Sequence, residues 1–224
     1  MQMEKLLLFS DTYMPFIALI VYLTQWKHIG KKEQPMLVYI VFNLVIYGLS
    51  NILWLQKINN LFLYHTGSLV ELWIVAYYIL SRSGGKNWRI AFYTIGAAYT
   101  VFSVLNVLFL EDITLFNSNS AVVASLAILF VCMYYMLNLS KSSDILYFQK
   151  LPMFWQVSGF LIYSAVSILV LLSYRYFVSL NMIKDGNNLW YVLDGAIILK
   201  FALISIGLLC HRKQRPASPL LFLL

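Results

Sequence analysis

Three ionisable side chains lie within long apolar runs of the sequence: Glu71, Asp194 and Lys200. A charge at the centre of a bilayer costs about 2.5–3.5 kcal/mol on insertion scales, so each group needs a partner, a cavity or a changed protonation state. If the runs are helices, a rise of about 1.5 Å per residue places Glu71 and Lys200 about 15 Å from the outer ends of their helices. We therefore predict that these two residues pair near the membrane midplane.

Asp194 and Asp11 form a second, shallower acidic group. By the same helical rise Asp194 lies about 7–8 Å below the outer end of its helix, and Asp11 reaches a similar depth in the first apolar run. Asp194 does not share a helix face with Lys200, six positions further on, so we do not expect them to pair. In a closed bundle the first and last helices are neighbours, which would bring Asp11 close to Asp194.

The run 61–80 carries a polar stripe along one side. Its members recur at helical spacing and are Tyr64, Gly67, Ser68, Glu71 and Tyr78. The outer halves of the runs add the polar residues Asn51, His65, Asn106 and Asn117. These positions predict a polar cavity that faces the outside and suits a small ligand. The alternative is an internal hydrogen-bond network that fixes the packing of the helices.

Seven apolar runs are long enough to hold a spanning helix, which needs about 20 mostly apolar residues. They are residues 6–26, 35–55, 61–80, 88–110, 113–139, 151–174 and 189–210. Only 11% of the residues are charged, against about 25% in a soluble domain. We therefore predict an all-α membrane protein: a single seven-transmembrane-helix bundle over residues 1–211, followed by a short basic tail over residues 212–224.

Lys and Arg are distributed unevenly between the two sets of loops. The rich set holds Lys27, Lys31, Lys32, Arg82, Lys86, Arg89, Lys141, Lys150, Arg212, Lys213 and Arg215. The poor set holds Lys5, Lys57, Arg175 and Lys184. Because cytoplasmic loops carry the excess of basic residues, we expect the N-terminus outside and the C-terminus in the cytoplasm.

Several other kinds of site are not indicated. His65 has no second metal-binding residue at ligand spacing on its face, no phosphate-binding loop follows a strand, and no serine has a histidine placed to activate it. The basic residues lie in short clusters between apolar runs, which is typical of membrane loops and not of a nucleic-acid-binding surface. We therefore expect neither an enzyme, nor a metal site, nor a nucleic-acid partner.

A lysine in the seventh helix and a carboxylate in the third resemble microbial rhodopsins, in which the lysine binds retinal as a Schiff base. That resemblance would make Lys200 the retinal attachment site. The sequence departs from the family pattern because Asp194 and Lys200 are six positions apart instead of four, and because the characteristic motif of the third helix is missing.

Four further stretches carry a closer resemblance. They begin at His65, Phe116, Pro152 and Asp194, and the third reads Pro-Met-Phe-Trp-Gln-Val-Ser-Gly-Phe-Leu-Ile-Tyr. In this order they resemble small seven-helix membrane proteins of Bacteroidota that are often encoded beside sensor histidine kinases. The resemblance covers the third to seventh helices, and departs at Asp194, where a histidine or small polar residue is more usual. It implies a bacterial inner-membrane protein with a role in signalling.

These observations lead to one main hypothesis and two alternatives. The main one is a membrane sensor or signalling-accessory protein, without enzymatic activity, that binds a small ligand and passes its signal to a partner such as a membrane histidine kinase. The alternatives are a small-solute or proton-coupled transporter that uses Glu71 and Lys200, and a retinal-binding protein that uses Lys200. The candidate site residues are Asp11, Tyr64, His65, Ser68, Glu71, Asp194 and Lys200.

Overall fold

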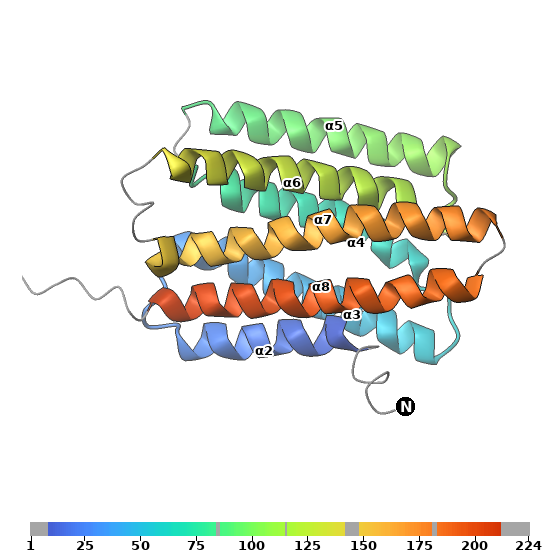
Figure 1. Ribbon diagram of the computed structural model, residues 1–224, viewed down its shortest axis with the longest axis horizontal. Helices are drawn as coiled ribbons and strands as arrows, with labels where there is room; N and C mark the ends of the chain where they lie inside the picture. The colour runs from blue at the N-terminus through green and yellow to red at the C-terminus, as the bar shows by residue number, and fades with distance from the viewer. Residues whose placement is uncertain (1–8, 84–85, 115, 142–147, 181–182, 212–224) are drawn as a thin grey trace, which may run out of the picture.

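The computed structural model describes residues 9–83, 86–114, 116–141, 148–180 and 183–211. The predicted tail at 212–224 and the start of the first predicted span lie outside these residues. Within them the chain forms seven α-helices, short 3-10 turns and no strand (Figure 1). In chain order they are α2 (Ser10–Thr24), η1 (Lys31–Glu33), α3 (Gln34–Leu55), α4 (Leu61–Leu80), α5 (Trp88–Phe109), α6 (Ser118–Ser140), α7 (Pro152–Ser179) and α8 (Ile183–Cys210).

Five of these elements are long and apolar enough to cross a membrane: η1 with α3, then α5, α6, α7 and α8. Helix α2 is 15 residues long, and α4 carries the predicted polar stripe, so neither meets the same criteria. Large apolar side chains are exposed along the helices, which lipid but not water would tolerate. The fold is therefore that of a helical multi-pass membrane protein.

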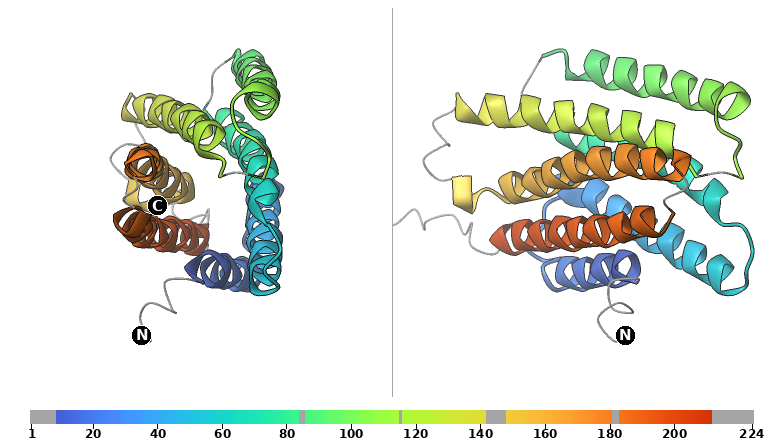
Figure 2. Two further views of the ribbon diagram at one scale, coloured as in Figure 1. Left: turned by 90° about the vertical axis from the view of Figure 1, so that its right-hand side faces the viewer. Right: turned by 45° about the vertical axis from the view of Figure 1, so that its right-hand side comes forward.

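Six of the helices form a closed ring in the order α2, α3, α4, α6, α7, α8, with α8 packing back against α2. Helix α5 lies outside the ring and packs against α4 and α6, as the end-on view in Figure 2 shows. The prediction that the first and last helices are neighbours is confirmed by the contact between α2 and α8. Nothing in the pattern of apolar residues indicated that the fourth predicted span would lie outside the ring.

Three helix boundaries differ from the predicted runs by five or six residues: α7 ends at Ser179 instead of residue 174, α8 begins at Ile183 instead of residue 189, and α6 begins at Ser118 instead of residue 113. The preceding segment is held by Glu111, whose carboxylate accepts hydrogen bonds from the backbone N–H of Asn119 at 3.0 and 3.1 Å and from the Ser118 hydroxyl. A carboxylate at this position satisfies N–H groups that the first helical turn leaves unpaired. This capping explains why the helix starts later than its apolar run.

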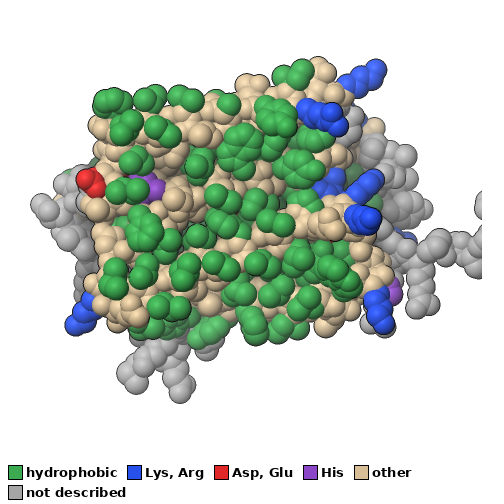
Figure 3. All heavy atoms as spheres, turned by 180° about the vertical axis from the view of Figure 1, so that it is seen from behind, with side chains coloured by type: hydrophobic (Ala, Val, Ile, Leu, Met, Phe, Trp, Pro, Cys, Tyr) green, Lys and Arg blue, Asp and Glu red, His purple; other side chains and the backbone are tan. Residues whose placement is uncertain are grey.

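Basic side chains gather at one end of the ring, where α2, α4, α6 and α8 finish. We call this end the basic end, and the opposite end the basic-poor end. Figure 3 shows most of the Lys and Arg side chains at the basic end, with apolar side chains spread over the face between the two ends. Helices α7 and α8 pack closely at the level of Lys200: a Cβ added at Gly159 would lie 2.9 Å from the carbonyl oxygen of Lys200. Small residues at such contacts let helix backbones approach each other in lipid.

Candidate ligand-binding site

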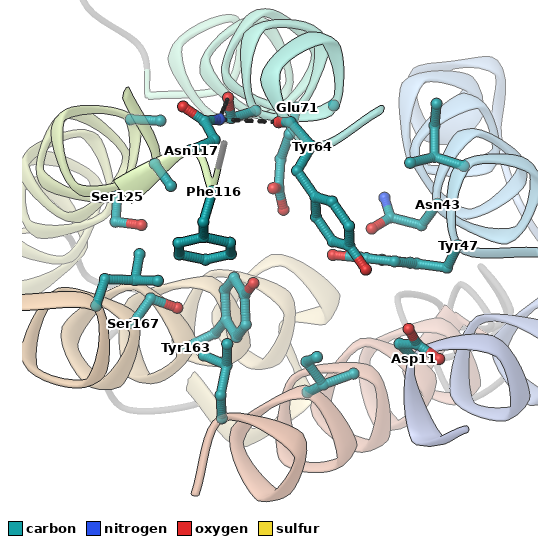
Figure 4. A pocket seen from close by; sticks show the side chains of 18 of the residues that line it. Asp11, Asn43, Tyr47, Tyr64, Glu71, Phe116, Asn117, Ser125, Tyr163 and Ser167 are labelled. Atoms are coloured by element: carbon teal, nitrogen blue, oxygen red, sulfur yellow. Dashed lines mark hydrogen bonds between the residues drawn. The ribbon is translucent and has the colours of Figure 1, made fainter. Parts of the chain in front are cut away.

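A cavity of about 400 Å³ lies inside the ring, in the half toward the basic-poor end. Every ring helix lines it, whereas α5 supplies none of its lining residues. The polar lining residues are Asp11, Asn43, Tyr47, Asn60, Tyr64, Ser68, Glu71, Asn117, Ser125, Tyr163, Ser167 and Asp194. Figure 4 shows the side chains of the labelled residues converging on this space from the surrounding helices. The cavity reaches from Glu71 near the middle of α4 to Leu61 at the start of α4 and to Trp190 of α8.

The floor of the cavity contains the expected ion pair between α4 and α8. Lys200 Nζ lies 3.5 Å from Glu71 Oε1, and the Tyr39 hydroxyl donates to the same oxygen at 2.8 Å. The Lys200 side chain is fully buried, and the Glu71 side chain is 17% exposed. A buried pair is better tolerated when further hydrogen bonds reach its charged groups, and Tyr39 supplies one such hydrogen bond to Glu71.

Aromatic rings complete the surroundings of Lys200. Its ammonium nitrogen lies 3.7 Å from the centre of the Tyr163 ring and 5.0 Å from that of Phe201. Cations within about 6 Å of a ring centre are attracted by the negative face of the ring. Lys200 is thus held by the Glu71 carboxylate and by the rings of Tyr163 and Phe201. Of the two charged residues, only Glu71 is among the described residues that line the cavity.

Asp11 and Asp194 line the cavity nearer its basic-poor end. Within the described residues Asp11 accepts side-chain hydrogen bonds only from neutral donors, Asn51 Nδ2 at 3.2 Å and Thr12 Oγ1 at 3.3 Å. Asp194 has no hydrogen bond or ion pair with any residue of the described ranges, and its charge is repelled by that of Asp11. Among the described lining residues there is no Lys, Arg or His. This part of the cavity therefore carries two carboxylates and no compensating base.

Three aromatic side chains stand at the basic-poor end of the cavity: Phe116, Tyr174 and Trp190. Their rings pack edge to face, with centres 5.0 Å apart for Phe116 and Trp190, 5.2 Å for Tyr174 and Trp190, and 5.6 Å for Phe116 and Tyr174. We call these residues the aromatic trio. They come from the segment before α6, from α7 and from α8, so the end of the cavity is built from three separate parts of the chain.

One buried polar atom of the cavity lining, Asn117 Oδ1, has no hydrogen-bond partner among the described residues. The side-chain nitrogen of Asn117 is used, because it donates to the Tyr64 carbonyl oxygen at 2.9 Å and to Ser68 Oγ at 2.8 Å. Asn117 is only 1% exposed. Buried polar atoms are nearly always paired with protein, water or a ligand, so Asn117 Oδ1 is available to a hydrogen-bond donor of a bound molecule.

The structure brings most of the predicted site residues together. Asp11, Tyr64, Ser68, Glu71 and Asp194 all line the cavity, and Lys200 lies directly beneath it. His65 is buried but is not part of the lining. Of the other outer-half polar residues, Asn117 lines the cavity, Asn51 binds Asp11 and Asn106 donates to Glu111.

A second polar cluster, around Glu33 at the basic end, was not anticipated. The Glu33 carboxylate accepts a hydrogen bond from the Tyr78 hydroxyl at 2.6 Å, and lies 3.5 Å from Arg82 Nη2 and 3.7 Å from His211 Nε2. Gln156 of α7 also contacts both Glu33 and Tyr78. Burial lowers the pKa of His211, although the charge of Glu33 acts in the opposite direction. In the sequence Glu33 follows two lysines and resembles a solvated loop residue, so no local signal marks it.

No group of His, Cys, Asp and Glu in the described part of the chain could hold a metal ion. The cavity instead offers carboxylates, hydroxyls, amides and ring faces, which are the groups that bind small organic molecules. No family model, no curated protein and no solved structure matches the chain.

Proposed function

We propose that this chain is a seven-span membrane protein that binds a small ligand in its central cavity and serves as a sensor or signalling-accessory protein. The observation that carries this proposal is that one cavity contacts all six ring helices. A ligand placed there would touch every helix of the ring at once. Its binding energy could therefore bias how the helices sit against one another.

The proposed orientation places the cavity toward the outside and the basic end in the cytoplasm of a bacterial inner membrane. The concentration of Lys and Arg at the basic end supports it, since cytoplasmic loops carry that excess. Helices α2 and α4 would complete the count of seven spans, because each packs within the ring beside longer apolar helices.

Two layers of polar contacts connect the cavity to the basic end. The first joins Tyr39 of α3, Glu71 of α4 and Lys200 of α8. The second joins Glu33, Tyr78 and Gln156, which belong to η1, α4 and α7. A ligand that displaced Glu71 would disturb the first layer and, through α3 and α4, the second. The readout would then pass through the basic loops to a partner such as a membrane histidine kinase.

Binding can be tested with the purified protein by measuring its thermal unfolding against a library of small metabolites. The Ala121→Phe variant would fill part of the cavity, since Ala121 is a lining residue. Ala98→Phe is its matched control, because Ala98 is exposed on α5 outside the ring. The proposal expects compounds that raise the unfolding temperature of wild type and Ala98→Phe but not of Ala121→Phe. If no compound shows this pattern, the central cavity is not a ligand site.

A second candidate function, transport, is favoured by the parallel arrangement of two helix triplets. The contacts of α2 with α3, α3 with α4 and α4 with α6 are matched by those of α6 with α7, α7 with α8 and α8 with α2. Because the single helix α5 separates the two triplets in the chain, both triplets begin at the same end of the bundle and run in the same direction. Transporters built from parallel repeats place substrate between the repeats.

A short sequence correspondence accompanies this arrangement. Pro35 is the second residue of α3 and Pro152 is the first residue of α7, and each is followed by methionine. The isoleucine-tyrosine pairs that end at Tyr47 and Tyr163 lie about three turns further on. Both tyrosines line the cavity. If liposomes that contain the protein take up a cavity ligand, and liposomes that contain the Glu71→Gln variant do not, transport is established. Binding of the ligand without uptake would support the sensor function instead.

A further inference from the structure

The charges of the cavity lining identify the class of ligand. We infer that the ligand is a small organic cation, an amine with N–H groups, whose charged nitrogen lies between Asp194, Asp11 and the aromatic trio. This inference rests on the proposed ligand-binding function and specifies its chemistry.

The first argument is electrostatic. Glu71 is paired with Lys200, but Asp11 has only neutral donors and Asp194 has no partner in the described ranges. Two carboxylates that repel each other in a half-buried cavity favour a cation between them. An anion would add to the repulsion, and a neutral ligand would leave it unchanged.

The second argument concerns what kind of cation fits. Inorganic cations such as Ca²⁺ take several oxygen ligands, mostly from carboxylates, at short distance. In the described part of the chain no three His, Cys, Asp or Glu side chains are grouped so that they could hold a metal ion. Phe116, Tyr174 and Trp190 instead present ring faces and edges at the same end of the cavity. Aromatic rings around a carboxylate are suited to organic ammonium groups, which they attract through the ring face.

The bundle already holds one ammonium group in this way. Lys200 is bound by Glu71 at 3.5 Å and by the face of Tyr163 at 3.7 Å. Asp194 and the aromatic trio offer the same kinds of groups, and the described residues that line the cavity supply no cation there. The comparison shows that the interior of this ring stabilises a protonated amine with a carboxylate and aromatic rings.

The third argument uses the unpaired side-chain oxygen of Asn117. Asn117 Oδ1 can only accept a hydrogen bond. An amine with N–H groups would donate to it, whereas a quaternary ammonium group has no N–H to donate. The cavity volume of about 400 Å³ lies near the small end of the range for ligand pockets, which suits a compact amine.

The test compares four probes of similar size on the purified full-length protein: phenethylamine, choline, phenylacetate and 2-phenylethanol. Binding is measured by calorimetry and by thermal unfolding. The expected order is phenethylamine first and choline weaker, with no binding of phenylacetate or 2-phenylethanol. Asp194→Asn should weaken phenethylamine binding at least about tenfold, the effect expected for removing a charged partner.

Asp112→Asn is the matched control, because Asp112 is an exposed carboxylate at the same end of the molecule and does not line the cavity. It should bind phenethylamine as wild type does. If Asp194→Asn does not purify as a folded protein, Asp11→Asn and the comparison of charge classes in wild type decide the question.

Equal loss of affinity in Asp194→Asn and Asp112→Asn would overturn the inference, as would preferential binding of phenylacetate or 2-phenylethanol, or no amine binding at all. In each of these cases the proposed function survives if any compound of the wider library stabilises wild type but not Ala121→Phe. If no compound does so, the proposed function itself fails.

Discussion

Lys200 and Glu71 are 129 positions apart in the chain, yet Nζ of one lies 3.5 Å from Oε1 of the other beneath the central cavity. The pair crosses the ring from α8 to α4, and Tyr39 of α3 donates to the same carboxylate oxygen. Three ring helices are therefore joined at one buried point. The stability of the bundle and the position of Glu71 in the cavity wall both depend on it.

Lys200→Met is expected to destabilise the protein by about 3–5 kcal/mol, because it leaves the Glu71 charge without its partner in a poorly solvated site. The double variant Lys200→Met/Glu71→Gln should recover much of this loss, since it removes both charges. Thermal unfolding in detergent of the wild type, the two single variants and the double variant measures the coupling. Strictly additive effects would show that the two side chains do not interact.

Tyr39→Phe removes one hydrogen bond to Glu71 and keeps the aromatic packing on Phe160 and Phe201. We expect a loss of about 1.5–3 kcal/mol, the range for hydrogen bonds to charged groups. Tyr93→Phe, on the exposed side of α5, serves as the control and should change stability little. A wild-type unfolding temperature in Tyr39→Phe would contradict the role assigned to this hydroxyl.

Gly159→Ala should destabilise the contact between α7 and α8 by about 1–3 kcal/mol, the usual effect of overpacking. The added Cβ would lie 2.9 Å from a backbone oxygen of α8, which cannot move aside as a flexible side chain would. Gly195→Ala is the matched control, because no atom lies within 4 Å of the added Cβ. Its greater helix propensity should leave stability unchanged or slightly higher. Unfolding curves of the two variants, recorded side by side, distinguish these outcomes.

The stability of the basic end should fall as the pH drops below about 6.5. Burial holds the pKa of His211 below its ordinary value of 6.5, so the unfolded chain binds this proton more readily than the folded one. Stability from neutral His211 is therefore present above pH 6.5 and is lost as the pH falls toward the lowered pKa. Glu33 and Arg82 face the imidazole and act in opposite directions on it.

Unfolding temperatures of wild type and His211→Gln between pH 8 and about 5 measure this contribution. The difference between the two proteins should change across that interval. A constant difference would mean that His211 does not titrate with folding.

The proposed orientation makes a separate prediction. In spheroplasts, a membrane-impermeant maleimide should label Lys57→Cys at the basic-poor end, and should label Lys141→Cys only after the membrane is permeabilised. The native Cys132 and Cys210 are buried, so they give a low background. The reverse labelling pattern would place the basic end outside and contradict the distribution rule for basic residues.

The sequence predicted those features that follow from position along a single helix. Because Glu71 and Lys200 have similar depths in their helices, their pairing could be predicted. The polar stripe from Tyr64 to Glu71 predicted one wall of the cavity. The contact between α2 and α8 followed from closing the ring. These inferences need only the helical repeat and the length of the apolar runs.

Features that depend on how separate elements meet could not be predicted in the same way. Phe116, Tyr174 and Trp190 lie in three separate segments and meet only in the folded bundle. Taken by itself in the sequence, Trp190 has the position of an ordinary aromatic residue at the membrane interface. Glu33 gains its role only because Tyr78, Arg82 and His211 are brought to it. The place of α5 outside the ring depends on side-chain packing against α4 and α6, and hydropathy carries no information about it.

The outlying position of α5 also has a practical consequence. Its outward side chains, such as Ile90 and Leu108, are 67% and 66% exposed and contribute nothing to the compartment inside the ring. A fluorophore or spin label attached at either position would leave the interior chemistry undisturbed. Distances from such a label to the ends of α3 and α8 would report directly on whether the ring changes shape when it is occupied.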